Sequence, residues 1–268
     1  MVDGVDASAA KMRARLVIDL EPGIARSETM GPRARGASQM GKEIDESDTK
    51  TIIDVMCGRF VLFTTGDSLI DATEIALDRS VVAPQGTPGP RYNLAPTQII
   101  PIVRPGEEML LEPARWGLFP HWKKDDSGPP LFNARGETVA EKPSFRDAFK
   151  QQRCLIPMDG YYEWHDKKPH FVSLGDELMW AAGLWSTGLD QMSATMVTTE
   201  SVEPIAWLHN RLPRFLEHDE LEQWLFGTAE EAKEMLHPVS QEWVKRLSVR
   251  EVSSDVGNVR NDHAGLLD

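Results

Sequence analysis

Residues 154–184, CLIPMDGYYEWHDKKPHFVSLGDELMWAAGL, carry four short apolar runs separated by turn-forming residues. The runs cover 154–156, 161–164, 170–174 and 179–184. Runs this short and this closely spaced are typical of strands joined by tight turns. We therefore predict four consecutive strands, which favours a sheet or a barrel over a helical bundle.

The sequence on both sides adds further strands and fewer helices. Thr228, followed three residues later by Glu231, is a start signal for a helix at 229–236. Because strands outnumber helices and lie at hairpin-like spacing, the expected class is α+β, mainly β and barrel-like, with peripheral helices. We predict other strands at 57–65, 99–103, 110–116 and 194–198, helices at 67–79, 145–152 and 218–225, a loop at 85–90, and an irregular segment at 91–98 around Pro96.

The first 55 residues differ in composition from the rest of the chain. They contain no Phe, Trp or Tyr, and Phe60 is the first aromatic residue of the sequence. A segment without aromatic side chains buries little apolar surface to offset its ordering entropy. We therefore expect residues 1–55 to be a disordered, cleaved or wrongly assigned extension, and residues 56–268 to form the folded domain.

Composition and charge limit the possible functions. The net charge of −13 argues against a generic nucleic-acid binder. The charge is uneven, since 217–234 is strongly acidic while 115–153 is richer in Lys and Arg than in Asp and Glu. The net charge therefore does not exclude a local basic groove that binds DNA. No run of 18 apolar residues exists, and we expect no transmembrane helix.

The cysteines and histidines exclude other classes. Two cysteines, Cys57 and Cys154, do not make a disulfide framework, which fits a reduced, cytoplasmic setting. No Cys/His pair has the spacing of metal ligands, so we expect neither a metal nor another cofactor.

Four polar clusters with apolar flanks could carry chemistry. They lie at 57–59 (CGR), 133–138 (NARGET), 161–164 (YYEW) and 209–213 (HNRLP). Cys154 lies inside an apolar run and is expected to be buried. Each cluster also has a structural explanation, with Cys57 as a small buried residue, Asn133 as a turn former, Glu163 as a strand residue facing water and His209 as a structural histidine.

In this order the clusters resemble the SOS response-associated peptidase (SRAP) family of abasic-site processing proteins. The resemblance rests on seven motifs between Met56 and Asp262, namely MCGRF, RYNLAPTQ, RWGLFPHW, FNARGET, CLIPMDGYYEW, HNRLP and VGNVRND. It implies that 56–268 is an SRAP domain that binds single-stranded DNA in the DNA damage (SOS) response. It also implies a covalent thiazolidine crosslink between an N-terminal cysteine, here Cys57, and the aldehyde of an abasic site, which the protein thereby protects.

The resemblance also implies roles for single residues. Glu163 would be the general acid/base and His209 a proton-transfer group. Asn133 would hold Cys57 and the sugar by hydrogen bonds. The residues implied to contact DNA are the arginines Arg59, Arg135 and Arg211, the apolar residues Pro96, Leu118 and Trp122, and Thr198.

The crosslink depends on a free α-amine at Cys57. Such an amine has a pKa of about 7.7–8.0 and adds to an aldehyde as a Schiff base, in lyase-type chemistry; the neighbouring thiolate then closes the ring. An internal cysteine lacks this amine, so the reaction requires a start at Met56 or a cut before Cys57.

Two other functions stay open. A thiol peptidase using Cys57, Glu163 and His209 on its own leader or on other proteins would need the thiol alone. A non-covalent DNA-binding module would form no adduct. For the crosslinking protein we expect a cytoplasmic monomer, on the nucleoid when bound to single-stranded DNA with abasic sites, and without a membrane partner.

Overall fold

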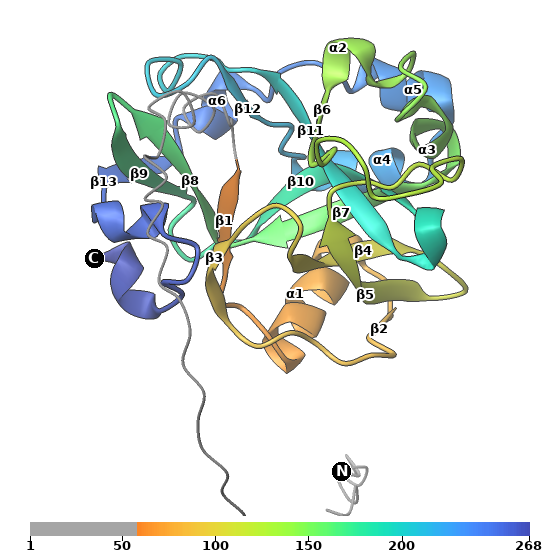
Figure 1. The fold of residues 1–268 in the computed structure, drawn as a ribbon, viewed down its shortest axis with the longest axis horizontal. Helices are drawn as coiled ribbons and strands as arrows, with labels where there is room; N and C mark the ends of the chain where they lie inside the picture. The colour runs from red at the N-terminus through yellow and green to blue at the C-terminus, as the bar shows by residue number, and fades with distance from the viewer. Residues whose placement is uncertain (1–57) are drawn as a thin grey trace, which may run out of the picture. The chain divides into compact units, whose positions relative to one another are not determined.

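Two β-sheets form the frame of residues 58–268, the part of the chain that the computed structural model describes (Figure 1). Most neighbouring strands are antiparallel. The strands are β1 (Arg59–Leu62), β2 (Val81–Val82), β3 (Arg91–Leu94), β4 (Ile99–Pro105), β5 (Met109–Trp116), β6 (Asn133–Arg135), β7 (Arg153–Met158), β8 (Gly160–His165), β9 (Lys168–Ser173), β10 (Met179–Ser186), β11 (Ser193–Glu200), β12 (Arg211–Pro213) and β13 (Ser248–Glu251).

One of the two sheets closes on itself. Its order is β12-β11-β10-β7-β4-β5-β2, with β6 paired to β11. A parallel pairing of β5 with β11, Arg115 with Ser193 and Trp116 with Ala194, joins the two ends of the path β11-β10-β7-β4-β5 into a ring. The other sheet, β13-β9-β8-β1-β3, is open. The α+β, mainly β, barrel-like prediction is therefore confirmed.

Short helices lie around this frame. Thr228 caps α5 as predicted, since its side chain accepts a hydrogen bond from Glu231 N while the Glu231 carboxylate accepts one from Thr228 N. None of the helices within 58–268 combines the length and the apolar composition that a membrane span requires. The helices are α1 (Asp67–Leu77), α2 (Gly136–Val139), α3 (Arg146–Gln151), α4 (Leu221–Phe226), α5 (Ala229–Glu234) and α6 (Gln241–Val244), with 3-10 turns η2 (Gly188–Asp190), η3 (His218–Glu220), η4 (Ser254–Gly257) and η5 (Ala264–Leu267).

The predicted series of strands from 154 to 184 is confirmed as β7 to β10. The irregular segment predicted at 91–98 is wrong in its first half, because β3 pairs with β1 and the chain leaves the strand only before Pro96. The helix predicted at 218–225 is a 3-10 turn followed by α4. The short strands β2, β6, β12 and β13 were not predicted, because runs of two to four residues carry no clear alternation.

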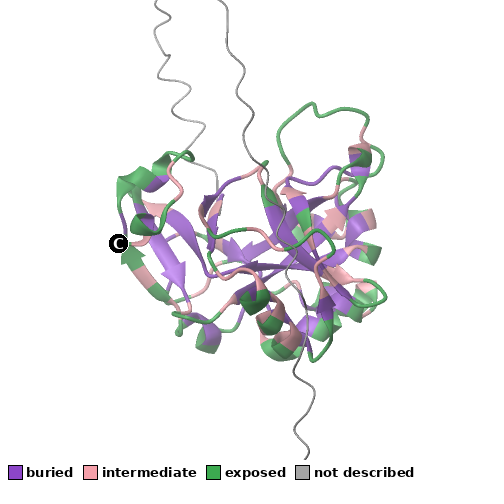
Figure 2. Ribbon diagram, turned by 90° about the horizontal axis from the view of Figure 1, so that it is seen from below, coloured by how far each residue is buried: buried purple, intermediate pink, exposed green. Residues whose placement is uncertain are grey.

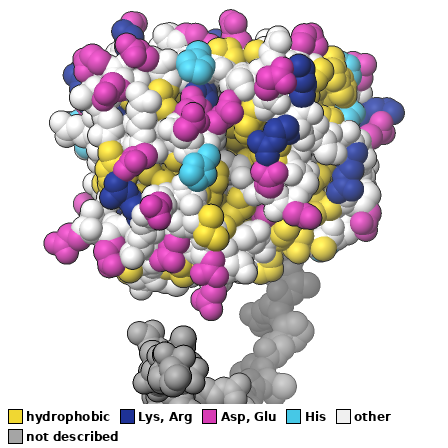
Figure 3. Space-filling model, turned by 180° about the vertical axis from the view of Figure 1, so that it is seen from behind, with side chains coloured by type: hydrophobic (Ala, Val, Ile, Leu, Met, Phe, Trp, Pro, Cys, Tyr) yellow, Lys and Arg dark blue, Asp and Glu magenta, His cyan; other side chains and the backbone are white. Residues whose placement is uncertain are grey.

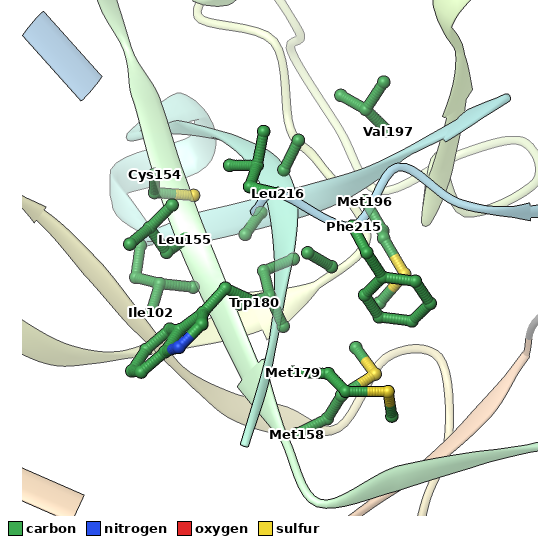
Figure 4. Packing of buried hydrophobic residues seen from close by; sticks show 14 of the residues in the cluster. Ile102, Cys154, Leu155, Met158, Met179, Trp180, Met196, Val197, Phe215 and Leu216 are labelled. Atoms are coloured by element: carbon green, nitrogen blue, oxygen red, sulfur yellow. The ribbon is translucent and has the colours of Figure 1, made fainter. Parts of the chain in front are cut away.

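The main core lies between the two sheets and inside the ring. Buried positions concentrate on the strands, whereas the outer turns of the helices and the loops are exposed (Figure 2). Cys154 is fully buried among these residues, as predicted, and burial raises the pKa of its thiol (Figure 4). A Cβ on its β10 neighbour, Gly183, would lie 2.8 Å from the Cys154 sulfur, so only glycine fits opposite this cysteine.

A second cluster covers the other face of the open sheet. It contains Val61, Tyr162 and Phe171 from the strands and Val256 and Leu266 from the C-terminal segment. The chain after β13 therefore packs on the outer face of this sheet, away from the main core.

Candidate functional site

Glu163 lies on β8 with its side chain buried. Successive strand residues alternate between faces, and Tyr162 packs in the outer cluster. Tyr161 faces the other way, with its ring 5.8 Å from the ring of Phe215 in the main core. Glu163 shares the Tyr161 face, is 3% exposed and accepts a hydrogen bond of 3.2 Å from Trp164 N. The alternative that Glu163 faces water is wrong, and a carboxyl group buried on this face is a candidate for proton transfer.

The described chain begins beside this carboxyl group. In the antiparallel register of β1 with β8, Arg59 lies opposite Tyr162 and Phe60 opposite Tyr161. Continuing the register by one residue sets Gly58, which is buried, opposite Glu163. Cys57, the predicted nucleophile, lies outside the described residues.

Arg59 points to the face of the sheet opposite to Glu163. Its Nη1 donates hydrogen bonds to Val256 O at 2.9 Å and to Asn93 Oδ1 at 3.4 Å. Burial lowers the pKa of this guanidinium. Arg59 thus ties the C-terminal segment to the sheet in this structure, and it would have to leave these acceptors to bind a phosphate.

The motifs RYNLAPTQ and VGNVRND meet at the same place. The Asn93 side-chain amide donates to three carbonyl groups of residues 256–261, at 2.9–3.2 Å. In return, Asp262 Oδ1 accepts from Tyr92 N at 2.5 Å and Asn93 N at 3.1 Å, and its Oδ2 pairs with the Arg91 guanidinium. Two of the motifs that carry the family resemblance therefore form one hydrogen-bonded cluster, which we call the clamp. It joins β3 to the C-terminal segment 256–262.

A second group of predicted residues gathers where β6, β11 and β12 run side by side. Thr198 on β11 lies opposite Arg135 of β6, and Asn133 lies on the same short strand. Arg211 forms a bidentate pair with Glu137, with N···O distances of 2.6 and 3.0 Å, and donates to Thr198 O at 2.6 Å. The Arg211 hydrogen bond holds the pKa of Glu137 below its usual range. Of these two predicted phosphate-binding arginines, Arg135 is exposed while Arg211 already holds a carboxylate.

His209 lies on the loop between β11 and β12. A hydrogen bond of 3.0 Å from Ser201 N to Asn210 O closes the base of this loop. The Nδ1 atom of His209 accepts a hydrogen bond of 3.0 Å from Arg211 N. In the neutral ring the proton must then lie on Nε2, so His209 presents an N–H donor at its free end.

The loop carrying His209 reaches the face of β8 that carries Glu163. The ring of Trp207 lies 5.2 Å from the ring of His165 on β8 and 5.4 Å from that of His170 on β9. His170 is the β9 partner of Glu163, and His165 shares the Glu163 face by strand alternation. Figure 1 shows this loop leaving β11 and passing over the ends of β8 and β9. The fold thus brings the Glu163 and His209 segments to one region, and these two residues are the candidates for proton transfer.

The apolar residues predicted to contact bases differ in exposure. Trp122 is 52% exposed, with its Nε1 3.3 Å from Pro143 O. Pro96 is half-buried. Leu118 is 1% exposed and packs in the main core, and Thr198 is fully buried, so neither side chain offers a surface to DNA as the structure stands.

Sequence reasoning missed two residues of this region. Glu137 was part of a quoted motif, but nothing in the sequence marks it as the partner of Arg211. Trp207 precedes His209 by two positions, and a large aromatic residue beside a candidate catalytic histidine was an available signal.

Other surface features lie away from these residues. Two hollows of about 230 and 390 Å³ are lined by residues from 85–113 and 174–246, and none of the predicted site residues lines either of them. The face seen in Figure 3 carries more acidic than basic side chains, so it offers no broad basic surface.

Comparison with known proteins identifies the family. The family described as "SOS response associated peptidase (SRAP)" matches residues 56–259. Abasic site processing protein YoaM of Bacillus subtilis is 37% identical over 229 residues, which cover 80% of this chain and 98% of YoaM. Abasic site processing protein YedK of Escherichia coli is 30% identical over 228 residues, covering 79% of this chain and 99% of YedK. A solved structure from Bacteroides thetaiotaomicron shares the fold, with a TM-score of 0.64 at 21% identity over 79% of this chain and 98% of that one. The chain belongs to the SRAP family.

Proposed function

We propose that this protein processes abasic sites in single-stranded DNA by forming a thiazolidine between an N-terminal Cys57 and the sugar aldehyde. Family membership and the names of YoaM and YedK support the substrate. The observation that carries the proposal is the register of β1 with β8, which, continued by one residue, sets Gly58 opposite the buried Glu163. Cys57 directly precedes Gly58 in the sequence.

The proposed reaction balances without an oxidant or a reductant. The α-amine of Cys57 attacks C1 of the open-chain sugar, and the resulting carbinolamine loses its oxygen as water to give an imine. The thiol then adds across the C=N bond. Sulfur bonds to C1, the thiol proton goes to nitrogen, and the net product is one thiazolidine and one water.

The described residues supply the proton transfers and part of the DNA contact. Glu163 gives a proton to the departing oxygen and takes one from the attacking amine. His209 donates its Nε2–H to an oxygen of the sugar or the phosphate. Arg135, which is exposed at the end of β6, binds a phosphate, and Asn133 on the same strand holds the sugar.

A comparison of three forms of the chain tests this proposal. The first begins at Cys57 with a free amine, and the second carries one additional alanine before Cys57. The third is the first form with the substitution Cys57→Ser. Each is incubated with single-stranded DNA containing an abasic site and run on a denaturing gel. A heat-stable shifted band is expected for the first form alone. Equal crosslinking by the form with the extra alanine would refute a thiazolidine.

The peptidase alternative makes a different prediction for the full chain. If Cys57 acts as a thiol nucleophile on its own leader, the intact mass of the 268-residue chain should fall to that of the form beginning at Cys57. The Cys57→Ala chain should keep its full mass. Such a cut without any DNA adduct would favour the peptidase.

A further inference from the structure

The loop between β11 and β12 is held in place at several points. Its two ends are joined by the Ser201 N to Asn210 O hydrogen bond, and Ile205 and Leu208 are 5% and 3% exposed. Backbone hydrogen bonds from Ile205 N to Val202 O and from Leu208 N to Ile205 O add two turns within it. The loop is therefore an ordered bridge from the closed sheet to the open sheet.

Trp207 is the large apolar residue that this bridge leaves in contact with solvent. It is 48% exposed. The rings of His165 and His170 contact its indole ring in T-shaped arrangements, with interplanar angles of 80° and 83°. Exposed indole surface is unfavourable in water and is stabilised when another apolar surface covers it. A loop anchored by buried residues on either side of Trp207 thus presents an indole whose orientation is already fixed.

The position of Trp207 relative to the candidate site suggests which ligand covers its indole ring. Trp207 contacts His170, the strand partner of Glu163, and lies two residues before His209. At an abasic nucleotide the base is missing, so each flanking base loses one stacking partner. An aromatic side chain fixed beside the sugar can supply that missing face, whatever the sequence of the DNA.

We propose that Trp207 stacks on the nucleobase that flanks the abasic nucleotide and so selects single strands in which that base is free to turn towards the loop. The inference rests on the proposed function. Preordering by His165 and His170 lowers the entropy lost when the base binds, which is the general benefit of a preorganised contact. The contact is non-covalent and does not require the Cys57 amine.

Binding of the full chain to two oligonucleotides tests the stacking. One carries a single tetrahydrofuran residue, an abasic analogue without an aldehyde, and the other carries tetrahydrofuran at the flanking positions as well. Fluorescence anisotropy gives the Kd for each. For the first DNA, Trp207→Ala should weaken binding by about 5- to 150-fold, the range for loss of one aromatic stack. Trp207→Phe should stay close to the unchanged chain.

The second DNA and a control variant separate stacking from a structural role. On the DNA without flanking bases, Trp207→Ala and the unchanged chain should bind equally. Phe226→Ala removes an aromatic ring of similar exposure, 45%, from α4 and should change neither Kd. An equal loss on both DNAs, or no loss on either, would overturn the stacking while leaving the crosslink untouched. Failure of the unchanged chain to bind either DNA would overturn the proposed function together with the stacking.

Discussion

The clamp around Asp262 gives a stability prediction whose size follows from its contacts. The change Asp262→Ala removes the acceptor of two backbone N–H groups, Tyr92 N at 2.5 Å and Asn93 N at 3.1 Å. Hydrogen bonds to a charged group are worth about 1.5–3 kcal/mol each, so the two together contribute about 3–6 kcal/mol. The pair with Arg91, whose side chain is 35% exposed, adds at most about 1 kcal/mol.

A thermal melt of the full chain measures this loss. The three contacts together contribute about 3–7 kcal/mol, and each kcal/mol shifts Tm by roughly 2–4 °C for a domain of about 200 residues, so Asp262→Ala should lower Tm by roughly 6–28 °C. Asp262→Asn keeps one oxygen acceptor without the charge and should lose about half as much.

Asp255→Ala is the matched control, since it removes an exposed carboxylate from the same C-terminal segment and should stay within about 0.5 kcal/mol of the unchanged chain. If Asp262→Ala has the same Tm as the unchanged chain, the motif VGNVRND does not act as a clamp. The reasoning would also fail if Asp255→Ala were as unstable as Asp262→Ala.

Three further predictions concern the site. Glu163→Gln should slow crosslinking by about 10²–10⁴-fold while leaving the Kd for the tetrahydrofuran DNA unchanged; a crosslinking rate equal to that of the unchanged protein over pH 5–8, followed on denaturing gels, would remove Glu163 from the mechanism. Arg135→Ala should reduce the magnitude of the slope of log affinity against log salt by about 0.7, because one phosphate contact is lost; an unchanged slope in an anisotropy salt series would make Arg135 structural. The depressed pKa of Glu137 stabilises the folded state above the unfolded pKa of about 4.3, and this contribution is lost as pH falls through the lower folded value. In urea unfolding between pH 2 and 6, the free energy of unfolding should therefore fall less with decreasing pH for Glu137→Gln than for the unchanged chain. The same pH dependence in both chains would show that the pair with Arg211 does not contribute to stability.

Local features of this protein follow directly from its sequence. The runs between 154 and 184 alternate with turn residues and form β7 to β10, and Thr228 with Glu231 starts α5, because alternation and capping involve residues within a few positions of each other. The burial of Cys154 follows in the same way from the apolar run around it. The family, too, can be identified from motifs, since these are runs of neighbouring residues.

The tertiary structure alone decided which partners the site residues have. Whether Glu163 is buried depends on which face of β8 turns towards the core, and the motif YYEW is compatible with either face. Arg59 and Arg211 look alike as phosphate-binding candidates, but one binds Val256 O and the other Glu137, 197 and 74 positions away in the chain. The bridge that sets Trp207 on His165 and His170 likewise joins segments from different sheets. Contacts of this kind join segments that lie far apart in the chain, so no pattern of neighbouring residues encodes them.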